Sequence, residues 1–151
     1  MKVLYAKEYM HRVLFLIERD DKVIKCYRSS GLSGTGHKGI ILPFSGLEDI
    51  VKLTNTPGYI YKEMFFCGRF IKHYKDLSRY PAIEKIMAEV KDLTKDINPE
   101  PTDISTREEL ADYAKQINKD MDKIIGDKKY YDFCPEEDRV PFNWESLKNK
   151  G

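Results

Sequence analysis

Residues 28–39 combine the residue types that proteins use to hold an anion. The segment contains four glycines, four hydroxyl side chains and three side chains that can carry a positive charge. Glycine reaches backbone conformations with φ > 0, which can aim successive N–H groups at one point. An arginine adds a planar two-pronged donor, and a lysine adds a compact charge. This composition predicts a loop that binds a phosphate-bearing ligand or a partner. The predicted binding residues are Arg28, Ser29, Ser30, Gly31, Ser33, Gly34, Thr35, Gly36, His37 and Lys38.

Two nucleotide-binding motifs come close to this segment, but neither fits. Residues 34–39 read G-x-G-x-x-G, yet a dinucleotide-binding loop must lead into a helix, and residues 40–43 are not helix-forming. Residues 31–39 lack the Ser or Thr that binds magnesium in a P-loop, which excludes an ordinary nucleoside triphosphatase. The alternative interpretation is a solvated connection, although the loop is longer than a hairpin needs.

The remaining nucleophilic and metal-binding residue types show no catalytic or metal-ligand spacing. There is no C-x-x-C, H-x-H or H-E-x-x-H motif. An odd number of widely separated cysteines is typical of a reducing compartment. We therefore expect no metal, no cofactor and no catalytic residue. The residues concerned are His11, His37, His73, Cys26, Cys67 and Cys134.

The charge balance limits the class of partner. The chain has 26 Lys and Arg against 25 Asp and Glu, which disfavours a dedicated nucleic-acid binder even though residues 68–75 interleave cations with aromatic rings. Residues 1–80 carry 14 basic and 8 acidic side chains, whereas residues 81–151 carry 12 and 17. This asymmetry indicates either a polarised surface or two halves that attract each other. No apolar stretch approaches the length needed to cross a bilayer, and the first residues do not resemble a signal peptide. We therefore expect a soluble cytoplasmic protein with no membrane partner.

Residues 1–76 are expected to be mainly β. Alternation over residues 3–9, an apolar run at 13–17 and strand composition at 23–27 predict three strands, the last two joined by a turn at 19–22. The apolar run is typical of a central strand. Further expected elements are a strand at 39–44 that ends at Pro43, one or two helical turns at 47–53, an aromatic strand at 59–66 and an ambiguous segment at 68–74.

Residues 81–126 are expected to form two helices. Apolar residues spaced by three and four predict a helix over 81–97. A capping box of Ser105 and Glu108 starts the second helix, and Gly126 ends it. In each predicted helix the apolar residues form one stripe along the helix, which is typical of helices that cover a sheet. The stripe residues are Ile83, Ile86, Met87, Val90, Leu93 and Ile97, then Leu110, Ala114, Ile117, Met121, Ile124 and Ile125.

The expected architecture is one α+β domain over residues 1–151. An N-terminal antiparallel sheet is covered by two C-terminal amphipathic helices, and an extended aromatic tail follows over residues 127–151. Large aromatic side chains seldom stay exposed without a partner, so the tail is expected to be pinned against the domain. The alternative is a docking peptide for another protein. The pinning residues would be Tyr131, Phe133, Phe142 and Trp144.

The whole chain resembles the small accessory proteins of T-even bacteriophages, which are rich in Lys, Asp and Tyr and lack an enzyme signature. The nearest approach to a signature runs from Tyr27-Arg28-Ser29-Ser30-Gly31 to Leu42-Pro43-Phe44. The resemblance implies a phage-encoded, non-essential protein that acts in the host cytoplasm by binding a host or defence component. It transfers no catalytic residue.

Two function hypotheses follow. The favoured one is a binding or inhibitory accessory protein that engages a macromolecular partner, such as a host protein, through residues 28–39. The other is a small enzyme or sensor that holds a nucleotide or another phosphate-bearing metabolite in the same loop. An enzyme would need a concave pocket with convergent titratable groups.

Overall fold

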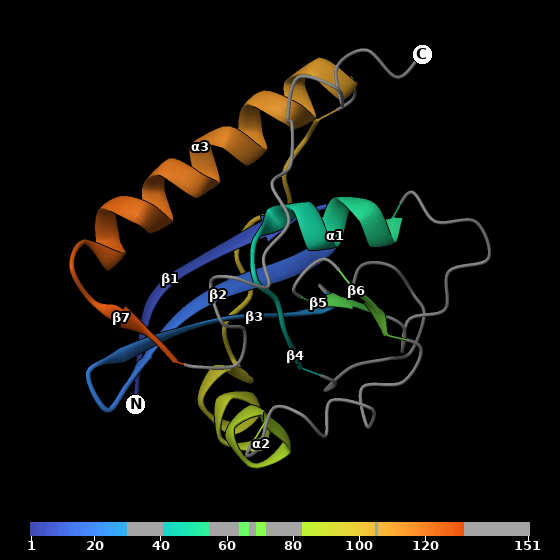
Figure 1. Cartoon of the computed structure of the whole chain (residues 1–151). Coiled ribbons are helices and arrows are strands. Elements are labelled where there is room, and N and C mark those ends of the chain that lie inside the picture. The colour runs from blue at the N-terminus through green and yellow to red at the C-terminus, as the bar shows by residue number, and fades with distance from the viewer. Residues whose placement is uncertain (30–40, 55–63, 67–68, 72–82, 105, 132–151) are drawn as a thin grey trace.

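The computed structural model describes residues 1–29, 41–54, 64–66, 69–71, 83–104 and 106–131. It shows a small α+β fold in which helices pack on a mixed sheet (Figure 1). The helices are α1 (Leu47–Thr54), α2 (Ile83–Thr94) and α3 (Arg107–Ile125). The strands are β1 (Lys2–Tyr9), β2 (Arg12–Arg19), β3 (Lys22–Ser29), β4 (Leu42–Pro43), β5 (Met64–Phe66), β6 (Arg69–Ile71) and β7 (Lys129–Tyr130).

The main sheet has the strand order β1-β2-β3-β4 with antiparallel neighbours. The N-terminal strands are antiparallel, as expected, but β7 joins them and pairs with β3 in parallel, so the sheet as a whole is mixed. Helix α3 carries the chain back along the sheet, so the residues after it run in the same direction as β3. β5 and β6 form a separate two-stranded sheet.

Strand β2 lies at the centre of the structure. Its residues Val13 to Ile17 are almost completely buried, because helices cover both faces of the sheet. Arg19 on β2 bonds to Glu89 of α2, whereas Tyr5 on β1 bonds to Asp120 of α3. Figure 1 places α2 and α3 on opposite sides of the strands. A strand covered on both faces is apolar at consecutive positions, so the prediction of a central strand at 13–17 is confirmed.

Helix α3 begins one residue later than the sequence predicted. Its N-cap is Thr106, whose hydroxyl accepts a hydrogen bond from the Glu109 N–H at 3.1 Å, while Ser105 lies outside the described residues. The sequence contains two overlapping S/T-x-x-E patterns, Ser105 to Glu108 and Thr106 to Glu109, and both fit the capping rule equally well. The end of the helix was predicted correctly: Gly126 adopts φ 53°, and its N–H bonds to the Asp122 carbonyl.

Helix α2 ends earlier than predicted. It stops at Thr94 rather than residue 97, and Leu93, expected in the apolar stripe, is 39% exposed. The Thr94 hydroxyl donates back to the Val90 carbonyl, and the Ile97 N–H donates to the Thr94 carbonyl, which closes the helix with a turn. Within the described part of the chain, no helix is both long and apolar enough to cross a membrane.

The start of the predicted tail contacts the sheet. The Tyr131 N–H donates to the Val23 carbonyl, and its ring lies under the cationic groups of Arg19 and Lys22 at 5.8 and 5.6 Å. Phe133, Phe142 and Trp144 lie outside the described residues. Their predicted pinning against the domain therefore stays a prediction.

Candidate functional site

Of the predicted anion-binding residues, the structure describes the side chain of Arg28 alone. Ser29 is the last residue of β3. Outside the described residues lie Ser30, Gly31, Ser33, Gly34, Thr35, Gly36, His37 and Lys38. The anion-binding loop therefore remains a prediction.

Arg28 supports the end of α2. Its guanidinium donates to the carbonyl oxygens of Thr94, at 2.8 Å, and of Ile97, and to Oδ1 of Asn98 at 3.3 Å. The group stacks 5.0 Å from the centroid of the Phe15 ring, and burial lowers its pKa. Carbonyls at the end of a helix lack partners within the helix, so Arg28 supplies donors that they need. Any anion held by Arg28 would share this side chain with three protein acceptors.

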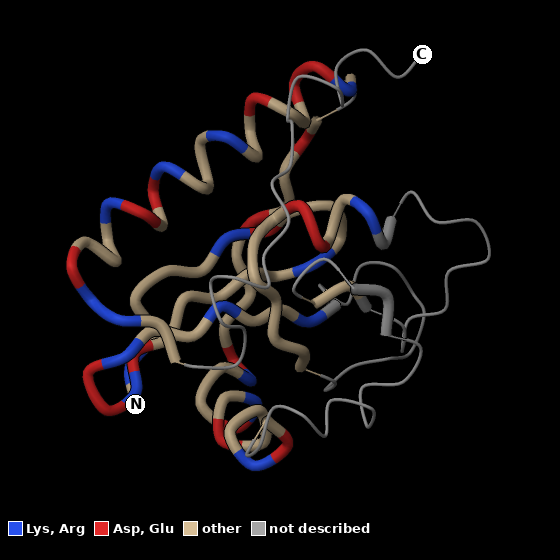
Figure 2. Tube along the Cα trace, viewed as in Figure 1, with Lys and Arg blue, Asp and Glu red and all other residues tan. Residues whose placement is uncertain are grey.

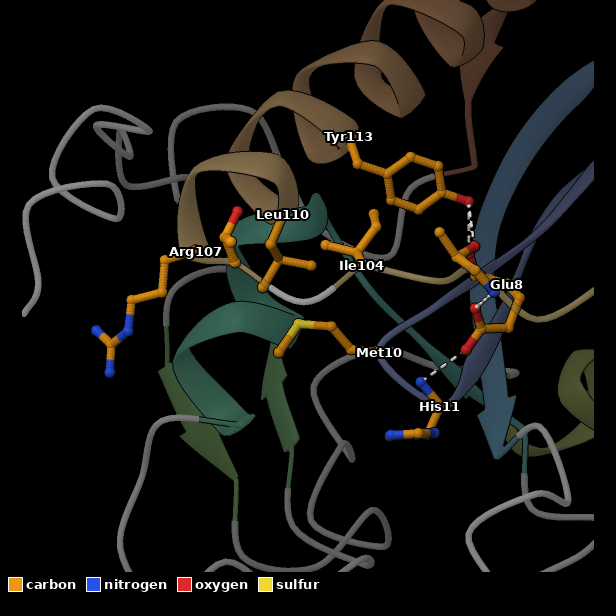
Figure 3. A pocket seen from close by; sticks show the side chains of 9 residues that line it. Glu8, Met10, His11, Ile104, Arg107, Leu110 and Tyr113 are labelled. Atoms are coloured by element: carbon orange, nitrogen blue, oxygen red, sulfur yellow. Dashed lines mark hydrogen bonds between the residues drawn. The ribbon is translucent and has the colours of Figure 1, made fainter.

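A cleft of about 330 Å³ lies where the β1–β2 turn meets the start of α3 (Figure 3). We call the part of the molecule around it, residues 8–12 and 102–113, the cleft end of the sheet. Met10, Ile104 and Leu110 form an apolar floor contributed by three separate segments. Polar side chains surround this floor. The complete lining is Glu8, Met10, His11, Thr102, Ile104, Thr106, Arg107, Leu110 and Tyr113.

A buried carboxylate holds the cleft together. Glu8 is 4% exposed, and its two oxygens accept the N–H groups of His11 at 2.9 Å and of Thr102 at 2.7 Å. The Glu8 carbonyl accepts the hydroxyls of Thr102 and Tyr113, and these two hydroxyls also lie 2.8 Å apart. Hydrogen bonds to a charged group are stronger than those between neutral groups. Glu8 therefore ties the turn, the segment before α3 and α3 itself into one unit.

The turn that forms one wall of the cleft has an unusual backbone. Tyr9 and Arg12 are paired, and the two residues between them adopt φ of 49° for Met10 and 63° for His11. This is the type I′ hairpin geometry, which favours Asn, Asp and Gly. Histidine tolerates it moderately well, whereas a long side chain such as methionine rarely adopts it. The buried Arg12 side chain bonds to the Met10 carbonyl at 3.1 Å, so the turn is held from both sides.

A stacked tyrosine pair lies behind the turn. The rings of Tyr9 and Tyr113 are 5.9 Å apart with an angle of 24° between their planes. The Tyr113 hydroxyl bonds to the backbone of Glu8, but the buried Tyr9 hydroxyl has no partner among the described residues. Burial raises the pKa of Tyr9, and nearby Arg12 opposes this in part. The pair packs α3 against the end of β1.

Two potentially cationic side chains lie on the rim. His11 and Arg107 are exposed, and neither side chain makes a hydrogen bond or an ion pair with the described part of the protein. Figure 3 shows the Arg107 side chain extending outward from the start of α3. Glu108 and Glu109 follow it in the first turn of the helix without lining the cleft. The rim therefore offers donors, while the floor offers apolar contact.

The described residues meet the requirements of neither a metal site nor a reactive thiol. No three His, Cys, Asp or Glu side chains in the described ranges are close enough to hold a metal ion. Cys26 is completely buried in β3, and burial raises the pKa of its thiol. A buried protonated thiol is a poor nucleophile.

Sequence reasoning missed the cleft residues. A two-residue gap between two strand-like runs, at residues 10–11, was the available signal for a hairpin, but it lacks the usual Asn or Gly. Ser29, the last described residue before the rest of the predicted loop, pairs with Arg12, which follows the Met10–His11 turn. The glycine-rich segment starts beside the turn that carries Met10 and His11.

The chain matches no protein-family model, no curated protein and no solved structure. The assignment of a function therefore rests on the geometry of the molecule.

Proposed function

We propose that this chain is a binding protein that engages a partner protein with the cleft end of the sheet. The observation that carries the proposal is the Met10–His11 turn. Both residues have positive φ, and Met10 accepts a backbone conformation that costs a long side chain free energy. Strained residues at a surface persist where their side chains serve a function.

The surroundings of the turn support a binding role. The turn is fixed by Glu8 and Arg12, so its two side chains are presented by a rigid support. Binding residues are commonly found on loops that a rigid scaffold positions. The predicted loop begins at Ser29, beside Arg12, so a partner at the cleft would also reach the start of that loop.

The residue types at the cleft favour binding over catalysis. The polar groups deep in the cleft, from Glu8, Thr102 and Tyr113, already bond to one another or to the backbone. Catalysis would require titratable groups that are free to exchange protons with a substrate. A phage accessory protein that binds a host component, as the resemblance implies, would fit this role.

A photo-crosslinking experiment tests the proposal. A photoreactive amino acid is placed at position 107 on the rim and, as a matched control, at position 119 on the exposed surface of α3. After irradiation in an extract of the source cells, position 107 should give a discrete adduct that position 119 does not give. Equal adducts at both positions, or none at position 107, would overturn the proposal.

A further inference from the structure

The inference concerns what occupies the cleft, and it rests on the proposed binding function. The polar groups of Glu8, Thr102 and Tyr113, which surround the apolar floor of the cleft, are already paired. Glu8 accepts two backbone N–H groups, and the hydroxyls of Thr102 and Tyr113 bond to each other and to the Glu8 carbonyl. Orienting a polar small molecule requires convergent groups with free hydrogen-bonding capacity. The floor of the cleft offers instead the apolar surface of Met10, Ile104 and Leu110.

The size of the cleft matches a side chain of a partner protein. Its volume of about 330 Å³ is near the lower limit for pockets that enclose small molecules. A cleft of this volume can hold one large apolar side chain and part of the residue next to it in the partner. Met10 is unbranched and flexible, so it can adjust to side chains of different shape.

The rim indicates the charge of the occupant. The Arg107 guanidinium and the His11 imidazole make no hydrogen bond or ion pair with the described residues, and a guanidinium is a donor that lacks an acceptor site. The one acidic lining residue, Glu8, is buried, and its carboxylate accepts two N–H groups. The occupant is therefore more exposed to the rim side chains than to the charge of Glu8. Charge complementarity therefore favours a carboxylate beside the apolar anchor.

We propose that the cleft binds an extended acidic segment of a partner protein. One large apolar residue of that segment lies on the floor formed by Met10, Ile104 and Leu110. An acidic residue next to it pairs with Arg107 or His11 at the rim. The polar groups around the floor are already paired and do not recognise the segment. Specificity therefore comes from its apolar residue on the floor together with its acidic residue at the rim.

Two peptides that differ only in charge test this proposal on the full chain. The probes are acetyl-Asp-Leu-Phe-Asp-amide and acetyl-Lys-Leu-Phe-Lys-amide, titrated into the ¹⁵N-labelled protein by NMR. The acidic peptide should shift the amide resonances of Met10, His11, Ile104 and Leu110. Its Kd should be about five- to tenfold lower than that of the basic peptide, as expected for one or two exposed ion pairs.

Three variants and a lipid probe complete the design. Arg107→Ala should remove most of the charge preference, Leu110→Asn should weaken both peptides, and Lys119→Ala should change neither. All three positions are exposed or partly exposed on α3, so folding should be preserved. Equal affinities, shifts at another surface or no binding would overturn the proposal, even if position 107 still crosslinks a partner. Tighter binding of decanoate than of either peptide would also overturn it, in favour of a lipid.

Discussion

The β1–β2 and β2–β3 hairpins close with the same two-residue turn but differ in residues and surroundings. Asp20 and Asp21 adopt φ of 52° and 63°, almost the values of Met10 and His11. Around the aspartates, Arg19 pairs with Asp20 and Glu89 near the surface. Around Met10 and His11, a buried glutamate and a buried arginine bond to the backbone. One turn uses residues that suit its geometry, whereas the other needs support.

The difference separates a turn that serves folding from a turn that also presents side chains. Aspartate suits the left-handed region, so the Asp20–Asp21 turn requires no further explanation. The Met10–His11 turn combines an unfavourable residue with a charged network that holds it in place. Figure 2 shows that charged residues elsewhere, as along α3, are of both signs and interspersed, as on an ordinary solvated surface.

The largest effect is expected from Glu8→Gln. The amide replaces one of two acceptor oxygens with a donor that faces an N–H group, and the site is buried. The free energy of unfolding should fall by about 2–4 kcal/mol. Urea unfolding monitored by circular dichroism measures this loss. The matched control is Glu18→Gln, whose carboxylate lies 3.9 Å from Lys128 at the opposite end of the sheet, where a loss below about 1 kcal/mol is expected. Equal losses would contradict the comparison.

Arg28→Ala should have the next largest effect. It removes the donors to the Thr94 and Ile97 carbonyls and to Asn98, so the free energy of unfolding should fall by about 2–3 kcal/mol. Arg28→Lys should recover only part of this, because an ammonium lacks the planar fork. Arg19→Ala, at the opposite end of the sheet on β2, should leave the thermal midpoint nearly unchanged, because its ion pairs lie near the surface. A full recovery by lysine would show that the fork geometry is unimportant.

Exchanging the turns for Asn-Gly should separate stability from binding. The double change Met10→Asn and His11→Gly relieves the unfavourable backbone and should stabilise the protein by about 1 kcal/mol. Binding at the cleft should be lost at the same time. The same exchange at Asp20 and Asp21 should change stability by less than about 0.5 kcal/mol and leave binding intact. If the exchange at Met10 and His11 instead destabilises the protein, the packing of the Met10 side chain stabilises the fold by more than its backbone strain destabilises it.

The smallest effect at neutral pH is expected from Tyr9→Phe. Its buried hydroxyl has no partner in the described structure, so removing it should be neutral or stabilise by up to about 1 kcal/mol. Tyr113→Phe, in contrast, loses the bond to the Glu8 carbonyl and should destabilise by about 1 kcal/mol. Unfolding curves of both variants at pH 7 compare the two hydroxyls directly.

Tyr9 also predicts a pH dependence. Its pKa is raised in the folded state, so above pH ~10 the unfolded chain loses a proton that the folded chain keeps. Stability should therefore fall as the pH rises through this range. Tyr9→Phe should reduce the slope by about 1.4 kcal/mol per pH unit. An unchanged slope would show that Tyr9 does not titrate differently in the two states.

The elements that local pattern specifies were predictable, and the cleft was not. Consecutive apolar residues at 13–17 identify β2, and Gly126 identifies the end of α3, since each signal is contained in a few neighbouring residues. Glu8 contacts Thr102 and Tyr113 across 94 and 105 residues of sequence. No local pattern encodes such a contact. A strained turn is also hard to predict, because residue preferences argue against it.

The long reach of the bonds to Glu8 has a consequence for biosynthesis. β1 is an edge strand of the described sheet and is made well before Thr102 and Tyr113, so its end gains their bonds only after both residues have been synthesised. Until then, a nascent β1–β2 hairpin presents an uncovered edge and an apolar surface that can pair with other chains. Premature termination before residue 102 should therefore yield aggregates rather than a folded fragment.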